Sequence, residues 1–196
     1  MSLIATVTPQ NASGTLGALY AEMEQAFGRI PNAFQLYSSS PELLAQQWAQ
    51  IRYYGEHPTL NFPLLAMIRL LVSQENACEY CVGFNEAMLI HRAGLSAEQV
   101  AAAKRNAADA PLPDKDKAML LFVLKATKTP KAVEKADLDG LRSMGWNDGD
   151  ILTRCTTAPG IWRWTWCSTP SRWTTIFRPR PQSRHSLIRE APWTYS

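Results

Sequence analysis

Two cysteines, Cys78 and Cys81, are separated by two residues and are the side chains of this sequence best suited to chemistry. On a helix, positions three apart share a face and lie within the Cα separation that a disulfide tolerates. Residues 1–5 show no basic segment followed by an apolar run, so we expect no secretory signal and a cytoplasmic location. In that reducing compartment, the pair indicates redox or metal chemistry rather than a permanent structural disulfide.

The pair is expected at the start of a helix that spans about residues 78–92. The positive end of a helix dipole favours a thiolate there, and the second thiol is close enough to resolve an oxidised intermediate. Cys78, Cys81, Asn85 and Met88 recur at helical spacing and form one stripe. The Asn85 amide can reach a sulfur or a bound substrate by hydrogen bonding, but it cannot act as a base at neutral pH.

Apolar residues at helical spacing predict helix after helix through the first 140 or so residues, with no strand of useful length. Helices are predicted over residues 16–27, from Ser40-Pro41-Glu42 to His57-Pro58-Thr59, over 62–73, over 78–92, over 96–104, from a cap at Asp114 to Thr129-Pro130, and over 133–143. The apolar run 62–72 is too short to span a bilayer and contains Arg69, so it predicts a buried core helix and no membrane partner. The predicted fold class is all-α.

The net charge of +3 hides an uneven distribution. Residues 1–153 contain 13 Lys and Arg against 16 Asp and Glu, whereas residues 154–196 contain 7 Arg and a single acid, Glu190. The basic balance therefore belongs to the C-terminal segment and gives no indication that the helical body binds nucleic acid.

The segment 153–196 does not follow the helical pattern. Its run from Trp162 to Trp166 has neither helical period nor turn residues. If the codons are regrouped by joining the last base of each to the first two of the next, every tryptophan of the segment becomes Leu, Met or Val, and Thr165 becomes Asp. We therefore divide the chain into a helical domain, 1–152, and an atypical tail, 153–196. We interpret the tail as the product of a shifted reading frame without a native role; the alternative is an unusual Trp-rich extension that packs against the protein.

Three segments together resemble the carboxymuconolactone decarboxylase-like family, and within it the alkylhydroperoxidase D-like, peroxidase-related branch. They are the motif Ser73 to Asn85, the upstream stretches Ala26 to Asn32 and Ser40 to Leu44, and the region Leu141 to Leu152. The similarity covers roughly residues 15–152. A Cys-x-x-Cys alone is weak evidence, whereas the motif together with the upstream segment is fairly specific.

The resemblance implies a multi-helix alkylhydroperoxidase D-like bundle that assembles as a homo-oligomer, without a cofactor or a metal. It also implies a thiol-dependent peroxidase or disulfide reductase. Cys81 would attack a small hydroperoxide or a partner disulfide, Cys78 would resolve the product as an intramolecular disulfide, and a dithiol protein would supply electrons.

The sequence departs from the family at the groups that relay protons. Asn85 stands where the best-known members have a His four residues after the second cysteine, and Ala66 stands where they have a Glu. Tyr80 replaces a His sometimes found between the cysteines, and Glu75 is a candidate substitute from its spacing alone. Because acid–base help contributes ~10²–10⁴-fold in rate, we expect slow turnover.

Other interpretations stay open at this point. The cysteines can be two small buried residues in a redox-silent oligomeric or ligand-binding protein, or the chain can be a lactone decarboxylase-like enzyme that uses no cysteine pair. A zinc site would need further ligands, for which only His91 and the tail cysteines are available. Glu75 and Glu79 can simply be solvated charges near a helix start.

Overall fold

The computed structural model describes the backbone of residues 5–168 and the side chains of residues 5–158. Within that part the chain forms two compact units, residues 5–54 and residues 55–168. The predicted tail lies largely outside the described residues. No helix in the described part is both long and apolar enough to cross a membrane.

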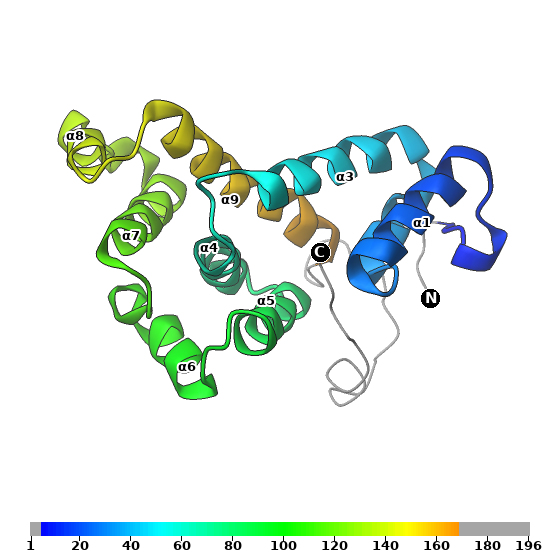
Figure 1. Ribbon diagram of the computed structural model, residues 1–196, viewed down its shortest axis with the longest axis horizontal. Coiled ribbons are helices and arrows are strands. Elements are labelled where there is room, and N and C mark those ends of the chain that lie inside the picture. The colour runs from blue at the N-terminus through cyan, green and yellow to red at the C-terminus, as the bar shows by residue number, and fades with distance from the viewer. Residues whose placement is uncertain (1–4, 169–196) are drawn as a thin grey trace. The chain divides into compact units, whose positions relative to one another are not determined.

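The described residues are helical throughout and include no strand, which confirms the predicted all-α class (Figure 1). The α-helices are α1 (Gly14–Phe27), α2 (Asn32–Gln35), α3 (Pro41–Glu56), α4 (Phe62–Glu75), α5 (Glu79–His91), α6 (Ala97–Arg105), α7 (Asp114–Lys128), α8 (Lys135–Ser143) and α9 (Asp148–Ser168). Short 3₁₀ turns lie at Pro9–Asn11, Leu36–Ser39, Ala107–Asp109 and Pro130–Ala132.

An aromatic cluster holds the first unit together. Phe27 closes α1, and Gly28 ends that helix in the left-handed conformation, at φ 69°. The rings of Phe27, Phe34 and Trp48 pack with their centroids 5.8–5.9 Å apart, and the Trp48 indole donates a 2.7 Å hydrogen bond to Glu22. Tilted and edge-on ring pairs of this kind stabilise a core beyond the area that they bury.

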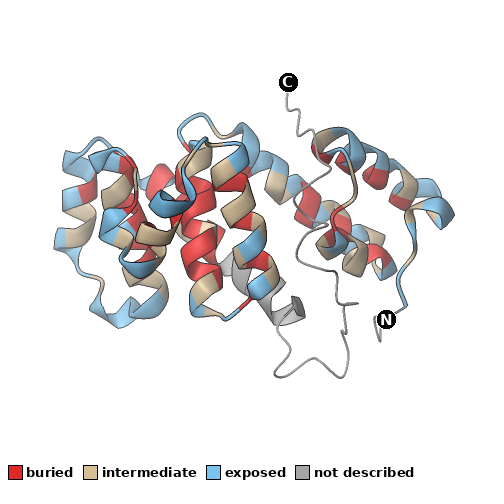
Figure 2. Cartoon of the chain, turned by 90° about the horizontal axis from the view of Figure 1, so that it is seen from below, coloured by how far each residue is buried: buried red, intermediate tan, exposed pale blue. Residues whose placement is uncertain are grey.

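Helix α4 is the centre of the second unit. Asn61 caps it by accepting a 2.9 Å hydrogen bond from the Leu64 amide, and Pro63 occupies its first turn. From Leu64 to Ser73 all but one of its residues are buried, because α4 packs against α5, α7 and α9. Figure 2 shows the buried residues gathered on the inner sides of the helices. The prediction of a core helix over 62–73 is confirmed, and α4 therefore provides a rigid base for the cysteines that follow.

Two local predictions need correction. Asp114 is not the cap of α7 but its first residue, since Pro113 occupies the cap position. Helix α8 begins at Lys135 rather than at residue 133, because Glu134 and Asp137 form a capping box there. Helix α9 runs through the proposed boundary at residue 152 and continues to residue 168, and the division of the chain there stays a prediction.

Candidate active site

The turn between α4 and α5 fixes the position of the cysteine pair. The Ala77 amide donates to the Gln74 carbonyl at 3.0 Å, and the Cys78 amide donates to the Ser73 carbonyl at 3.0 Å. This is the Schellman pattern of hydrogen bonds, which requires a left-handed residue at the position after the C-cap. Ala77 occupies that position with φ 51°, and it is the only non-glycine residue of the described part with a positive φ. The chain thus turns sharply enough for the next helix to begin at once.

Cys78 is the N-cap of α5, and its side chain acts as the cap. Its Sγ accepts a hydrogen bond from the Cys81 amide at 3.4 Å, at the positive end of the helix dipole. Both features favour negative charge on this sulfur. The two cysteines are thiols in the structure, not a disulfide. Because capping places Cys78 over the first turn of α5, it approaches the segment that carries Cys81.

The two thiols differ in exposure. The residue Cys78 is 1% exposed, whereas Cys81 is 8% exposed. Both residues are therefore buried, and Cys81 is the more exposed of the two.

Asn85 and Met88 continue the predicted stripe, and both are buried. The Asn85 side-chain amide donates a 2.8 Å hydrogen bond to the Cys81 carbonyl, one turn earlier. It therefore binds the backbone that carries Cys81.

Glu75 lies at the last turn of α4, and its carboxylate forms an ion pair with the Lys128 ammonium at 2.6 Å. About half of each of these side chains is exposed. Next to the turn, the Ser73 hydroxyl is buried and has no hydrogen-bond partner. An unpaired buried hydroxyl is costly, so this oxygen is a polar group still able to bind a neighbour.

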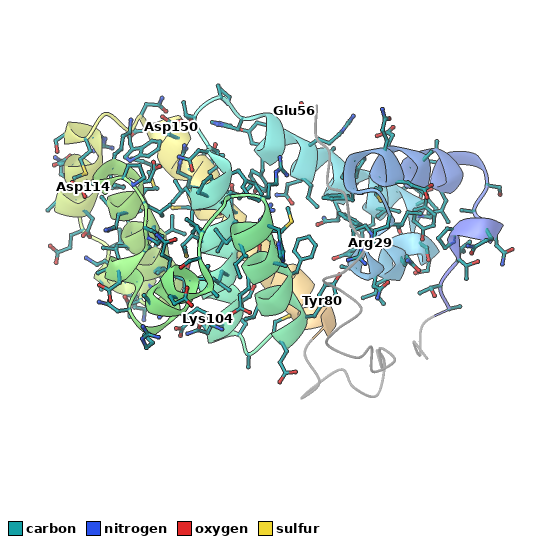
Figure 3. All side chains as sticks on the ribbon, turned by 60° about the horizontal axis from the view of Figure 1, so that its bottom comes forward. Arg29, Glu56, Tyr80, Lys104, Asp114 and Asp150 are labelled. Carbon is teal, nitrogen blue, oxygen red and sulfur yellow. The ribbon has the colours of Figure 1, made fainter. Side chains whose placement is uncertain are left out.

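Aromatic side chains extend from the same end of α5. The Tyr80 and Phe84 rings are stacked, with centroids 6.4 Å apart and planes 20° apart. In Figure 3, Tyr80 lies apart from Lys104, which belongs to α6. Ala66, at the position of the family's relay Glu, is 2% exposed within α4, so no carboxylate reaches the pair from there.

A groove in the second unit lies away from the cysteines. It has a volume of about 600 Å³ and is lined by Glu86, Ile90, Val100 and Lys104, among others, on α5 and α6. Neither cysteine lines it. Among the residues that the structure describes, no group of three His, Cys, Asp or Glu side chains is arranged to hold a metal ion.

Sequence reasoning found the stripe of Cys78, Cys81 and Asn85 but missed three features that surround it. They are the left-handed Ala77, the unpaired hydroxyl of Ser73 and the ion pair of Glu75 with Lys128. Only the left-handed Ala77 has a signal in the sequence, namely a helix end just before the motif. That signal is weak, because alanine does not indicate a left-handed turn as glycine does.

No family model matches the chain, and no curated protein matches it. Several solved structures of other proteins do match the chain. An uncharacterized peroxidase-related protein from Ralstonia eutropha JMP134, described as an alkylhydroperoxidase AhpD core, has a TM-score of 0.74 and 22% identity over 92% of this chain and 93% of its own. An uncharacterized peroxidase-related protein from Silicibacter sp. TM1040 has a TM-score of 0.76 and 22% identity over 94% of both chains.

A third neighbour is the debrominase Bmp8. Its apo structure has a TM-score of 0.66 and 17% identity over 82% of this chain and 87% of its own. A cysteine-to-alanine variant of that debrominase is also known in complex with 2,3,4-tribromopyrrole. At these identities the comparisons establish architecture, and they agree with the resemblance found in the sequence. The chain therefore has the alkylhydroperoxidase D-like fold.

Proposed function

We propose that the chain is a thiol-dependent peroxidase or disulfide reductase that cycles Cys78 and Cys81 between dithiol and disulfide. The observation that carries the proposal is the hydrogen bond from the Cys81 amide to the Cys78 sulfur, which places two thiols of unequal exposure on one helical turn. A buried, capped sulfur beside a more accessible one is the arrangement that a resolving and an attacking thiol need.

The proposed cycle has three steps. The Cys81 thiolate attacks the O–O bond of a small hydroperoxide, which forms a sulfenic acid and releases an alcohol. The Cys78 sulfur then displaces the sulfenic oxygen as water, and a disulfide forms. A dithiol protein reduces that disulfide by exchange and becomes oxidised itself. One peroxide and two thiols thus give one alcohol, one water and one disulfide.

The proton relay of this site is sparse. Asn85 holds the Cys81 carbonyl and cannot carry a proton, and the carboxylate of Glu75 is engaged by Lys128. A proton-transfer role for Glu75 stays a prediction from its spacing. We expect turnover that is slower by the ~10²–10⁴-fold that general acid–base catalysis contributes.

A second candidate is a redox-silent oligomeric or ligand-binding protein, and the observation in its favour is the burial of Cys78 at 1% exposure.

The debrominase that shares the fold suggests a halogenated ring as a further electrophile, beside peroxide and disulfide. A cysteine thiolate that attacks oxygen can also attack a halogenated ring. A lactone decarboxylase-like reaction remains the alternative without cysteine chemistry.

The test is a thiol titration before and after hydrogen peroxide, together with peroxide consumption in the presence of dithiothreitol. The unsubstituted chain is expected to lose two thiols reversibly. Cys81→Ser should abolish consumption, and Cys78→Ser should leave a sulfenic acid that dimedone traps. Cys155→Ser is the matched control, because burial raises the pKa of the Cys155 thiol and the cycle does not use it.

Thiols that stay unchanged in peroxide, and in a small disulfide, would contradict the proposal and favour the redox-silent protein. Loss of 2,3,4-tribromopyrrole without loss of peroxide would move the assignment to dehalogenation. Full activity of Cys81→Ser would show that the attacking thiol is wrongly assigned.

The partners follow from the cycle. We propose a small hydroperoxide as substrate, a dithiol protein as electron donor, and a homo-oligomer in a reducing compartment such as the cytoplasm. Light scattering of the purified protein measures the subunit number directly.

A further inference from the structure

The buried face of α9 changes character within two turns. The first turn of the helix is capped by reciprocal hydrogen bonds. The Asn147 side chain accepts a hydrogen bond from the Asp150 amide at 2.8 Å, and the Asp150 carboxylate accepts one from the Asn147 amide at 3.4 Å. Ile151 is buried. Leu152 is then 66% exposed. The buried side chains that follow are mostly polar, namely Thr153, Arg154, Thr157 and Ala158. Core helix α4 buries almost only apolar residues.

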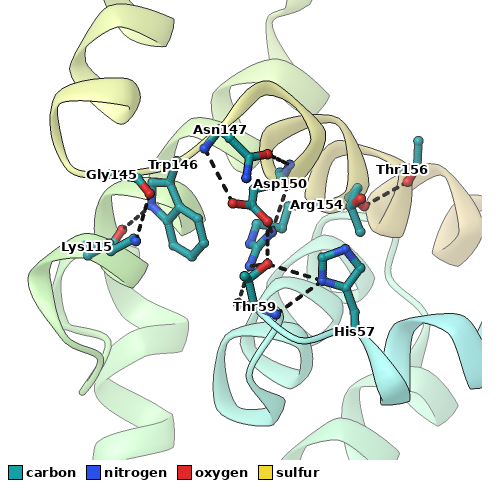
Figure 4. A network of polar contacts seen from close by, with 10 residues as sticks. His57, Thr59, Lys115, Gly145, Trp146, Asn147, Asp150, Arg154 and Thr156 are labelled. Atoms are coloured by element: carbon teal, nitrogen blue, oxygen red, sulfur yellow. Dashed lines mark hydrogen bonds and ion pairs between the residues drawn. The ribbon is translucent and has the colours of Figure 1, made fainter.

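Arg154 is the clearest misfit. It is 0% exposed, and burial lowers the pKa of its guanidinium. It donates to the Asp150 carbonyl at 2.9 Å and to Thr59, it forms a buried ion pair with the Asp150 carboxylate at 3.4 Å, and it lies 4.0 Å from the centre of the Trp146 ring (Figure 4). Its Nε has no partner. A buried cation with an unsatisfied donor is costly, and a native core rarely retains one outside a functional site.

The Asp150 carboxylate has two partners besides Arg154. It also accepts hydrogen bonds from the Thr59 hydroxyl and from the Asn147 amide. The cap of α9 is thus made by residues before position 152, and the conflict lies after it.

The sequence conflicts with the helix further on as well. Pro159 and Gly160 stand inside a helix that runs to residue 168, where one removes a backbone donor and the other is a weak helix former. Local preference and observed fold disagree at each of these positions, which natural sequences avoid.

The genetic code separates the two possible shifts of reading frame. Tryptophan has the single codon TGG. One regrouping turns each tryptophan of the segment into glycine, which no stable helix tolerates in such number. The other turns each into leucine, methionine or valine and gives aspartate at position 165. In that frame positions 155, 162 and 166 are all apolar, and with Ile151 they fall within about 60° of arc on a helix.

We infer that the native helix α9 departs from this sequence immediately after Leu152, through loss of one base. In the native frame, position 154 then takes Ala, Thr, Pro, Ser, Lys, Glu or Gln instead of arginine. Position 156 takes histidine or tyrosine, both of which titrate. The restored helix therefore gains an apolar stripe that continues from Ile151, and it adds a side chain able to carry a proton.

The test compares the present chain with one translated after a single base is inserted between codons 152 and 153 of the same gene. Insertion of two bases at that point, which gives the glycine frame, is the matched control. The protein translated after the one-base insertion (the one-base chain) should melt about 5 °C or more above the present chain. The protein translated after the two-base insertion (the two-base chain) should not.

A one-base chain that melts no higher than the present one, or that fails to fold, would overturn the inference. Genomic resequencing across codons 148–158 gives an independent readout: an extra base supports the inference, and an unchanged sequence contradicts it.

Discussion

At the scale of the residue, the cysteines depend on a strained neighbour. Ala77 holds a left-handed conformation so that the Cys78 amide can reach the Ser73 carbonyl. For a residue with a Cβ this conformation costs about 1–2 kcal/mol. Glycine would remove that strain at the expense of a more flexible unfolded chain, so the two effects partly cancel.

We expect Ala77→Gly to stabilise the protein by up to about 1 kcal/mol and Ala77→Val to destabilise it by about 1 kcal/mol or more. Urea denaturation, followed by circular dichroism, measures both. Thiol reactivity should persist in the glycine variant. A glycine variant less stable than the valine variant would show that the turn is not left-handed in solution.

The stripe of Cys78, Cys81 and Asn85 was predictable because helical spacing fixes which residues share a face. The hydrogen bond of the Asn85 amide was not predictable, because the amide binds the Cys81 carbonyl rather than a sulfur. The ion pair of Glu75 was not predictable either, because Lys128 lies 53 residues further along the chain. Such pairs depend on how α4 and α7 pack.

At the scale of the element, the sequence predicted best where burial is strongest. The run 62–73 matches α4 because an apolar helix in a core has a clear pattern. The ends of helices were less certain. The helix predicted over 96–104 does begin at a capping box made by Ser96, whereas the start of α8 at the acidic capping box of Glu134 and Asp137 was not predicted. The short helix α2, of four residues, carries too little periodicity to be predicted.

The start of α9 should make stability depend on acid. Burial raises the pKa of Asp150, but hydrogen bonds from Thr59 and from the Asn147 amide, with the charges of Arg154 and His57, lower that pKa by more. A carboxyl whose pKa is depressed by folding stabilises the protein above the unfolded pKa. That contribution disappears as the pH falls below about 4.

We therefore expect Asp150→Asn to lower the free energy of unfolding at pH 6 and to weaken its decline between pH 5 and pH 3, two values that bracket the ordinary pKa of about 3.9. Chemical denaturation at each pH measures the effect. Asp109→Asn, which removes an exposed carboxylate, is the control and should preserve the native profile. Parallel profiles for the native chain and Asp150→Asn would contradict the prediction.

At the scale of the whole molecule, burial is distributed unevenly among the helices. Helix α4 contains several residues with no exposure, among them Leu64, Ile68 and Leu70, whereas Leu141 is the one buried residue of α8. Local opening of a helix requires free energy in proportion to the contacts it breaks.

Amide hydrogen exchange should therefore be slowest in α4 and much faster in α8. Mass spectrometry of peptides covering Phe62–Glu75 and Lys135–Ser143 measures this directly. Equal protection in the two helices would show that α8 is covered by something beyond the contacts of a single chain, such as a second copy.

The cap of α5 couples the oxidation state of the protein to its backbone. In the dithiol form, the sulfur of Cys78 satisfies the amide of Cys81. Once that sulfur bonds covalently to its neighbour, it becomes a weaker acceptor, and the amide must find water or remain unsatisfied. Electron loss at the sulfurs would thus loosen the first turn of the helix, and a reducing partner would find its target disulfide on the segment that oxidation has opened.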